Sequence, residues 1–137
     1  MATFNKFQPF VEDVWEGVHV FGTDQLVAFL TTHANIPDVT DRLLSGVTPI
    51  SYTNLSSRNI TTTSSGQSGG TYTLVLADLV LTASGAVATF RHAGIYNDGT
   101  TVQTDPLVGW WDYGSDVTLA ASETFTYDFG ASVISST

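Results

Sequence analysis

The chain of 137 residues lacks cysteine altogether and carries few charged side chains. The absence of cysteine excludes disulfides and thiolate chemistry, and it argues against a small secreted scaffold held together by disulfides. Charged residues make up 12% of the chain, about half of the roughly 25% that is usual. Low charge is expected where much of a surface contacts other subunits, because interface cores are depleted in charge. An ordinary Ser/Thr-rich β-protein explains the composition equally well.

Basic residues are the scarcest charged class, with four lysines and arginines against thirteen acidic residues and a net charge of −9. The four are scattered, so the chain has no basic footprint for nucleic acid or for an anionic membrane. The N-terminus has no basic region followed by an apolar run, so we expect no signal peptide. No stretch approaches 18 consecutive apolar residues, so we expect no membrane span. The expected partners are proteins.

Motifs of known catalytic or metal chemistry are also missing. The chain has no G-x-S-x-G elbow, no glycine-rich phosphate loop and no assembled Ser/His/Asp pattern. Four aspartates between Asp98 and Asp116 lie near predicted strand ends, but the spacing of a calcium-binding EF-hand is absent, which leaves calcium a minor alternative. We therefore predict no enzymatic activity, no cofactor and no required metal. The histidines lie in different predicted elements without HxH or HExxH spacing, and they are His19, His33 and His92.

Apolar residues near the N-terminus follow helical spacing. Phe4, Phe7, Val11, Val14 and Val18 are separated by three and four residues, which predicts a helix over about residues 4–18. Asn5 is the expected cap, and the helix is expected to end near Gly17 or Gly22. Phe10 and Trp15 widen the stripe, which packs either on the chain's own core or on a neighbouring subunit.

The rest of the chain shows the short alternating runs of half-buried strands, separated by turn residues. Strands are predicted over residues 24–32, 71–81, 86–96, 107–113, 117–119, 124–129 and 132–135. A strong turn signal lies at 97–99, a tight turn is expected at 120–123, and a short helix at 39–44. This arrangement predicts one domain, residues 1–137. Its fold class is mainly β, an antiparallel β-sandwich or jelly-roll-like fold with one N-terminal α-helix.

Two further features are candidates for contact with a partner. Residues 51–70 are polar and almost devoid of core-forming side chains, which predicts a long loop that is either a hairpin tip or an arm ordered by a neighbour. Trp110 and Trp111 are adjacent, so one of them points outward if both lie in a strand. An outward tryptophan either stacks on sugars or anchors a protein interface, and the second interpretation is favoured. The predicted interface residues are Phe4, Phe7, Phe10, Trp110 and Trp111.

Three segments resemble a known family. They are the start MATFNKFQPFVEDV with GVHVFGTDQLVAFLTTHA, the middle FRHAGIYND, and the run DPLVGWWDYGSDVTLAASETFTYDF. Together they cover about half of the chain and are similar to the capsid decoration or cement proteins of tailed bacteriophages. The third segment is the most specific, and residues 51–70 are not diagnostic.

The resemblance implies a β-sandwich that binds the outer surface of an assembled capsid, commonly as a homotrimer. The implied partners are the major capsid protein and other copies of the chain, and the implied location is the virion surface after synthesis in the host cytoplasm. The family offers no catalytic motif to transfer. A phage tail or fibre component is the first alternative, and a sugar-binding β-sandwich module is the alternative from another class.

Overall fold

The computed structural model describes residues 2–137 and consists mainly of β-strands. Ten strands and one α-helix follow one another along the chain, with a short 3₁₀ turn at Leu44–Gly46. The elements are β1 (Asn5–Lys6), α1 (Gln8–Trp15), β2 (Leu26–Thr31), β3 (Asn59–Ile60), β4 (Thr62–Ser68), β5 (Thr71–Leu76), β6 (Leu79–Thr82), β7 (Phe90–Asn97), β8 (Leu107–Val117), β9 (Thr124–Tyr127) and β10 (Ile134–Ser136). No helix within residues 2–137 is long and apolar enough to cross a membrane.

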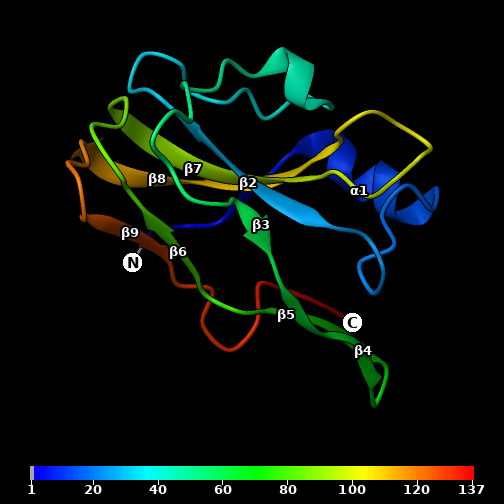
Figure 1. Cartoon of the computed structure of the whole chain (residues 1–137). Helices are drawn as coiled ribbons and strands as arrows, with labels where there is room; N and C mark the ends of the chain where they lie inside the picture. The colour runs from blue at the N-terminus through cyan, green and yellow to red at the C-terminus, as the bar shows by residue number, and fades with distance from the viewer. Residues whose placement is uncertain (1) are drawn as a thin grey trace.

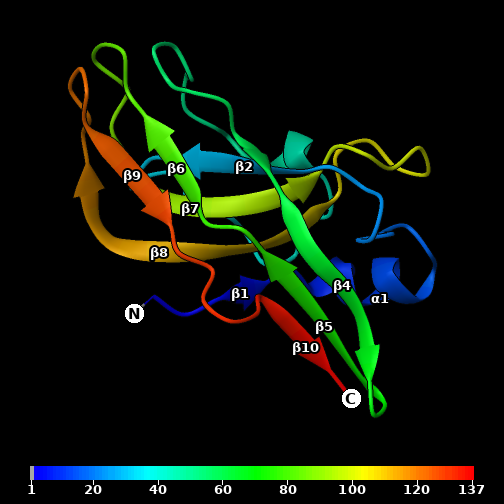
Figure 2. The same ribbon diagram turned by 60° about the horizontal axis from the view of Figure 1, so that its bottom comes forward.

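The strands form two layers. One layer is a five-stranded antiparallel sheet in the order β1-β8-β7-β2-β3, and the other contains the sheets β10-β5-β4 and β6-β9 (Figure 1). The chain passes directly from β3 in the first layer to β4 in the second. Figure 2 shows the β4–β5 hairpin projecting from the body beside α1. The predicted antiparallel β-sandwich with one N-terminal helix is confirmed.

The core lies between the layers and around the centre of the large sheet. All six residues of β2 are buried, and so are seven of the eight in β7. Phe90 meets Phe125 of the opposite layer edge to face, with ring centroids 5.0 Å apart. The Tyr127 hydroxyl donates to the carbonyl oxygens of Phe29 and Gly94 at 3.0 and 3.3 Å. Burial raises the pKa of this hydroxyl well above its ordinary value, so it stays a donor that ties β9 to the large sheet.

A glycine makes room at the centre of the large sheet. Gly94 lies opposite Phe29 of β2 on one side and Trp110 of β8 on the other, so the three positions share one face of the sheet. A Cβ atom at Gly94 would lie 2.1 to 2.7 Å from three ring atoms of Phe29. The glycine in this strand is therefore a packing requirement.

The predicted helix over residues 4–18 is too long at its start. The helix spans only Gln8–Trp15, and Asn5 belongs to β1, where it pairs with Trp110. Phe7 occupies the N-cap position without a capping side chain, and Pro9 lies in the first turn. Pairing with the edge of β8 holds these first residues extended, so a tertiary ladder overrides the helical spacing that Phe4 and Phe7 share with later residues.

The predicted long polar loop at residues 51–70 is also wrong for its second half. Residues 59–60 form β3, and residues 62–68 form β4, which pairs with β5 from Thr62↔Leu76 to Ser68↔Thr71. Gly69 and Gly70 make the turn with positive φ values of 59° and 85°, as a two-residue hairpin turn requires. Because backbone hydrogen bonds to β5 order this hairpin, it needs no partner to become ordered.

Smaller differences concern the connections. No helix forms over residues 39–44, since Leu43 makes an isolated bridge with Pro106 and only the 3₁₀ turn follows. The Asn97-Asp98-Gly99 sequence ends β7 but opens a longer loop that reaches to Pro106. In place of the two strands predicted over 107–113 and 117–119 there is one strand, β8, which ends at Val117.

Candidate functional site

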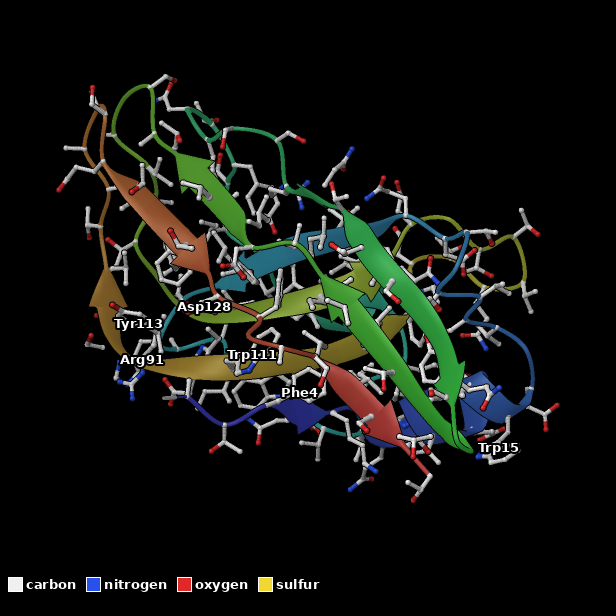
Figure 3. All side chains as sticks on the ribbon, turned by 90° about the horizontal axis from the view of Figure 1, so that it is seen from below. Phe4, Trp15, Arg91, Trp111, Tyr113 and Asp128 are labelled. Atoms are coloured by element: carbon white, nitrogen blue, oxygen red, sulfur yellow. The ribbon has the colours of Figure 1, made fainter. Side chains whose placement is uncertain are left out.

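The aromatic groove is a half-open hollow between the end of β8 and the β9–β10 connection. Its volume is about 380 Å³. Phe4 and Trp111 form one wall, and the chain around Asp128 crosses opposite them (Figure 3). The residues that line it are Ala2, Phe4, Ala93, Trp111, Tyr113, Phe125, Thr126, Tyr127, Asp128, Phe129, Gly130, Ser132 and Val133.

Strand alternation explains why aromatic rings converge there. Trp111 and Tyr113 are two residues apart on β8, so both point toward the second layer. Phe125 lies on β9 opposite them, 5.2 Å from Tyr113 between ring centroids. Phe4 lies 5.0 Å from Trp111 at an interplanar angle of 51°. Tyr113 remains 54% exposed, so the groove presents aromatic surface to solvent.

Charged groups lie beside this groove. Arg91 donates from Nε to Asp112 Oδ1 at 2.8 Å and from a second nitrogen to Asp112 Oδ2 at 3.3 Å. The hydrogen bonds from Arg91 and from the Gly114 amide lower the pKa of the Asp112 carboxyl. Asp128 is exposed in the groove wall and accepts from the Gly130 amide at 3.0 Å. Asp128 thus contributes hydrogen-bond acceptor oxygens to the groove wall.

The helix groove is a second hollow, of about 630 Å³, between α1 and β10. Phe4 and Val133 line both grooves, so the two lie end to end along the open side of the sandwich. Trp15 is 86% exposed at the rim, the most exposed of the large apolar side chains. The lining residues are Phe4, Lys6, Phe10, Val11, Val14, Trp15, His19, Val20, Phe21, Gly22, Ser65, Tyr72, Val133, Ile134, Ser135 and Ser136.

A cluster of buried polar side chains holds α1 against the rest of the protein. Asp13 is only 1% exposed although it is on α1, and its Oδ1 accepts from an Arg42 nitrogen and from Gln103 Nε2 at 3.2 Å. Arg42 also reaches Glu12 at 3.0 Å. The hydrogen bond that Arg42 donates to Glu12, with the charge of Asp13, raises the pKa of the Arg42 guanidinium. The ion pair fixes α1 to the segment after β2.

His19 forms the other part of this cluster. Its ring is stacked on Phe21 at 5.3 Å, and Asn97 donates to its Nδ1 at 3.1 Å. Asn97 also donates to Asp24 Oδ2 at 2.7 Å. Burial lowers the pKa of His19, against the opposing influence of the Asp13 and Asp24 carboxylates. The ring is therefore neutral near pH 7.

The structure divides the five predicted interface residues. Phe7 is fully buried, and Phe10 and Trp110 are 7% and 9% exposed, so these three belong to the protein's own core. The prediction that Phe7 and Trp110 contact a partner is wrong for this fold, because their side chains pack inside it and line neither groove. Phe10 packs mainly in the core but also lines the helix groove, so an interface role for it stays a prediction. Phe4 and Trp111 line the aromatic groove, where an interface role stays a prediction.

Sequence reasoning missed Tyr113, Phe125 and Trp15 as surface residues. Tyr113 follows Trp111 at a spacing of two, which was a usable signal for a shared strand face. Trp15 was assigned to the packing stripe, but the buried residues of α1 are Phe10 and Asp13, and Trp15, two residues after Asp13, lies on the opposite side of the helix.

The aspartates between Asp98 and Asp116 do not converge on one point. Asp112 pairs with Arg91, and Asp116 lies 3.5 Å from His33. Asp105 lies near Asp98, and burial together with that neighbouring charge raises the pKa of Asp105. Within residues 2–137 no three histidine, aspartate or glutamate side chains are grouped so that they could hold a metal ion.

The two grooves thus offer stacking faces, apolar walls and a few hydrogen-bonding groups, which is the chemistry of a binding surface. Comparisons of the chain with protein-family models, with curated proteins and with solved structures give no match.

Proposed function

We propose that this protein is a virion structural protein of a tailed bacteriophage, a decoration or cement protein on the outer surface of the capsid. In this proposal it bridges neighbouring copies of the major capsid protein and stabilises the shell. It acts as a homo-oligomer, with a trimer as the expected state, and without catalysis or a cofactor.

The main support for the proposal is which segments of the chain form the aromatic groove. The segments that resemble decoration proteins supply every lining residue except Gly130, Ser132 and Val133. They contribute Phe4 from the start of the chain, Ala93 from the middle, and the aromatic residues of β8 and β9. The part of the chain that carries the resemblance is therefore the part that builds an exposed aromatic surface. Exposed aromatic surface of this kind is typical of protein interfaces.

The mechanism is multivalent binding. A ligand that binds only the assembled lattice stabilises that lattice by mass action. Contacts linked in one oligomer raise the effective concentration of each further contact, so modest single contacts give high avidity. The projecting β4–β5 hairpin is the second expected contact element, because its residues are polar and mostly exposed (Figure 2).

The direct test is to add the purified protein to capsids that lack it and to locate it by electron microscopy. We expect copies over the head surface and a higher disruption temperature of the shell. Trp111→Ala should weaken binding, whereas Val80→Ala, at an exposed position on β6, should not. Density confined to the tail would replace the proposal by the tail or fibre alternative. Light scattering of the free protein and of the bound complex measures the oligomeric state.

A sugar-binding module is a second candidate, favoured by the groove itself. Trp111 and Tyr113 line an open hollow that also contains the Asp128 carboxylate and the Ser132 hydroxyl. Aromatic faces and such acceptors suit the apolar face and the hydroxyls of a pyranose ring. Titration with neutral oligosaccharides, followed by tryptophan fluorescence, tests this candidate. A saturable change that Trp111→Ala removes would favour sugar binding over capsid binding.

A further inference from the structure

We propose that the helix groove is a separate docking site for an extended segment of a partner protein, one that combines apolar side chains with a carboxylate. The aromatic groove is not part of this site beyond the shared Phe4 and Val133. The inference does not depend on the proposed capsid role, because binding of such a segment is measurable with the free protein.

The charge of the groove indicates the charge of the occupant. The chain has thirteen acidic residues, yet none of them lines the helix groove, whereas Lys6 does. Two of the other basic residues, Arg42 and Arg91, are paired with carboxylates, and Arg58 lies over the Tyr52 ring at 3.7 Å. Lys6 forms no ion pair within residues 2–137. The chain has a net charge of −9. In the helix groove, however, an anionic group of a partner would meet the Lys6 cation, and no carboxylate in the groove wall would repel it.

His19 supplies a hydrogen-bond donor that the protein leaves unused. The Asn97 side-chain oxygen accepts from the Gly99 amide at 2.9 Å, so the Asn97 nitrogen must face His19 and Asp24. This nitrogen donates to His19 Nδ1, which is therefore an acceptor, and the ring proton of the neutral imidazole lies on Nε2. Within residues 2–137 His19 Nε2 is buried without a partner, and the His19 ring lines the groove. A buried unpaired donor is costly, and a small shift of the ring toward the groove would let a carbonyl or carboxylate oxygen of an occupant accept from it.

An open strand edge favours a peptide over a small amphiphile. β10 pairs with β5 on one side only, from Ile134↔Leu74 to Ser136↔Tyr72. Four consecutive residues, Val133 to Ser136, line the groove. Successive side chains of a strand point to opposite faces, so this continuous lining means that the strand borders the groove with its edge. An unpaired edge offers backbone hydrogen bonds to an added extended segment.

The apolar wall supplies the anchor. Val11 and Val14 on α1 are 42% and 39% exposed, Val20 is 52% exposed, and Trp15 stands at the rim beside them. Exposed tryptophans in such a setting are typical hot spots of binding. An apolar side chain of the segment would pack among these residues while its backbone follows β10 and its carboxylate meets Lys6.

The test uses two seven-residue synthetic peptides, one in which valine and phenylalanine alternate with glutamate and one in which lysine replaces glutamate. Tryptophan fluorescence and amide chemical shifts report binding. We expect the glutamate peptide to bind with shifts at β10 and α1, and the lysine peptide to bind about tenfold more weakly or not at all. Trp15→Ala and Lys6→Glu should each reduce affinity about tenfold, while Val80→Ala, far from the groove on β6, should leave it unchanged.

Several outcomes would overturn the inference. One is equal binding of both peptides, and another is binding of the glutamate peptide that Trp15→Ala does not affect. The third is that neither peptide binds to protein whose folded state has been verified. If decanoate binds at α1 and the glutamate peptide does not, the groove is an amphiphile site instead. If light scattering shows self-association that Trp15→Ala abolishes, the occupant is a second copy. Failure of capsid binding would leave all of these results unaffected.

Discussion

Strands β2 and β4 are nearly equal in length but opposite in environment. β2 has the sequence LVAFLT and all six residues are buried, whereas β4 has the sequence TTSSGQS and none of its seven residues is buried. Both are paired antiparallel along their length. The hairpin is therefore ordered mainly by its backbone pairing, while side-chain burial concentrates stability in the large sheet.

The β4–β5 hairpin is ordered because β5 is anchored in the core. Leu74 and Leu76 of β5 are buried in the core, and β4 pairs with this anchored strand on the side away from β10. Residues at the hairpin tip have few packed neighbours, so substitutions there should be tolerated except at the two turn glycines, whose φ values are positive. The packed body and its exposed periphery should therefore respond differently to substitution.

The largest effect is expected from a methyl group added at the centre of the sheet. Gly94→Ala places a Cβ against the Phe29 ring, and we expect a loss of about 3 kcal/mol in the free energy of unfolding, the upper range for overpacking. Gly66→Ala on β4 is the matched control, since its Cβ would meet nothing within 4 Å. We expect that control to remain within about 0.5 kcal/mol of the parent. Denaturant unfolding measures both variants, and equal losses would contradict the contrast.

The second prediction concerns the loss in free energy of unfolding when each of two arginine–carboxylate pairs is broken. Arg42→Gln leaves the Asp13 carboxylate buried with Gln103 as its remaining donor, and we expect a loss of about 2 kcal/mol, because a buried charge loses its partner. Arg91→Gln breaks the pair with Asp112, whose side chain is 42% exposed. We expect less than about 1 kcal/mol there, as for surface ion pairs. A larger loss for Arg91→Gln in thermal or urea unfolding would refute this ranking.

The same contrast explains which parts of the fold the sequence predicted. Short apolar runs place β2 and β7, which are buried on both faces, and alternating residues place β5 and β9, because burial of one face or of both imposes these patterns. The polar β4 has no such pattern, since neither of its faces is buried, so periodicity could not reveal it. The start of α1 was misplaced for the opposite reason: Phe4 and Phe7 are apolar because a strand and a core need them, and their helical spacing is coincidental.

The candidate site could be predicted only in part. Adjacent tryptophans in a strand must face opposite ways, and Trp110 and Trp111 do so. Which of the two tryptophan side chains is buried depends on the segments that cover each face of the sheet, and these segments are distant in the sequence. The aromatic groove likewise joins residues 2–4 to residues 111–133. Such a meeting is set by the pairing of β1 with β8, which no local pattern encodes.

The third prediction concerns the hairpin turn. Gly70 has a φ of 85°, a conformation that costs other residues about 1 kcal/mol or slightly more. Gly70→Ala should therefore fray the β4–β5 tip by about that amount while the large sheet is unchanged. Faster amide hydrogen exchange at the tip, with unaltered exchange in β2 and β7, is the expected observation. Faster exchange throughout the protein would show that the hairpin and the body unfold together.

The smallest effect is a pH dependence that originates at His19. Burial lowers the pKa of His19 in the folded protein below the ordinary value of 6.5, and Asp13 and Asp24 only partly oppose this shift. As the pH falls below about 6.5, the unfolded chain binds the proton first, so the free energy of unfolding decreases. The decrease ends below the lowered pKa of the folded state, where both states are protonated.

The melting temperature measured between pH 8 and pH 5.5 should therefore fall slightly toward the acidic end. His19→Gln removes the titrating group while an amide oxygen remains to accept from Asn97, so the variant should show a flatter profile over the same range. The pKa of Asp112 lies below its ordinary value, so that carboxylate stays ionised throughout and contributes no slope. An identical slope in the variant would assign the pH dependence to another group and would remove the support for a neutral His19 whose Nε2 proton faces no partner.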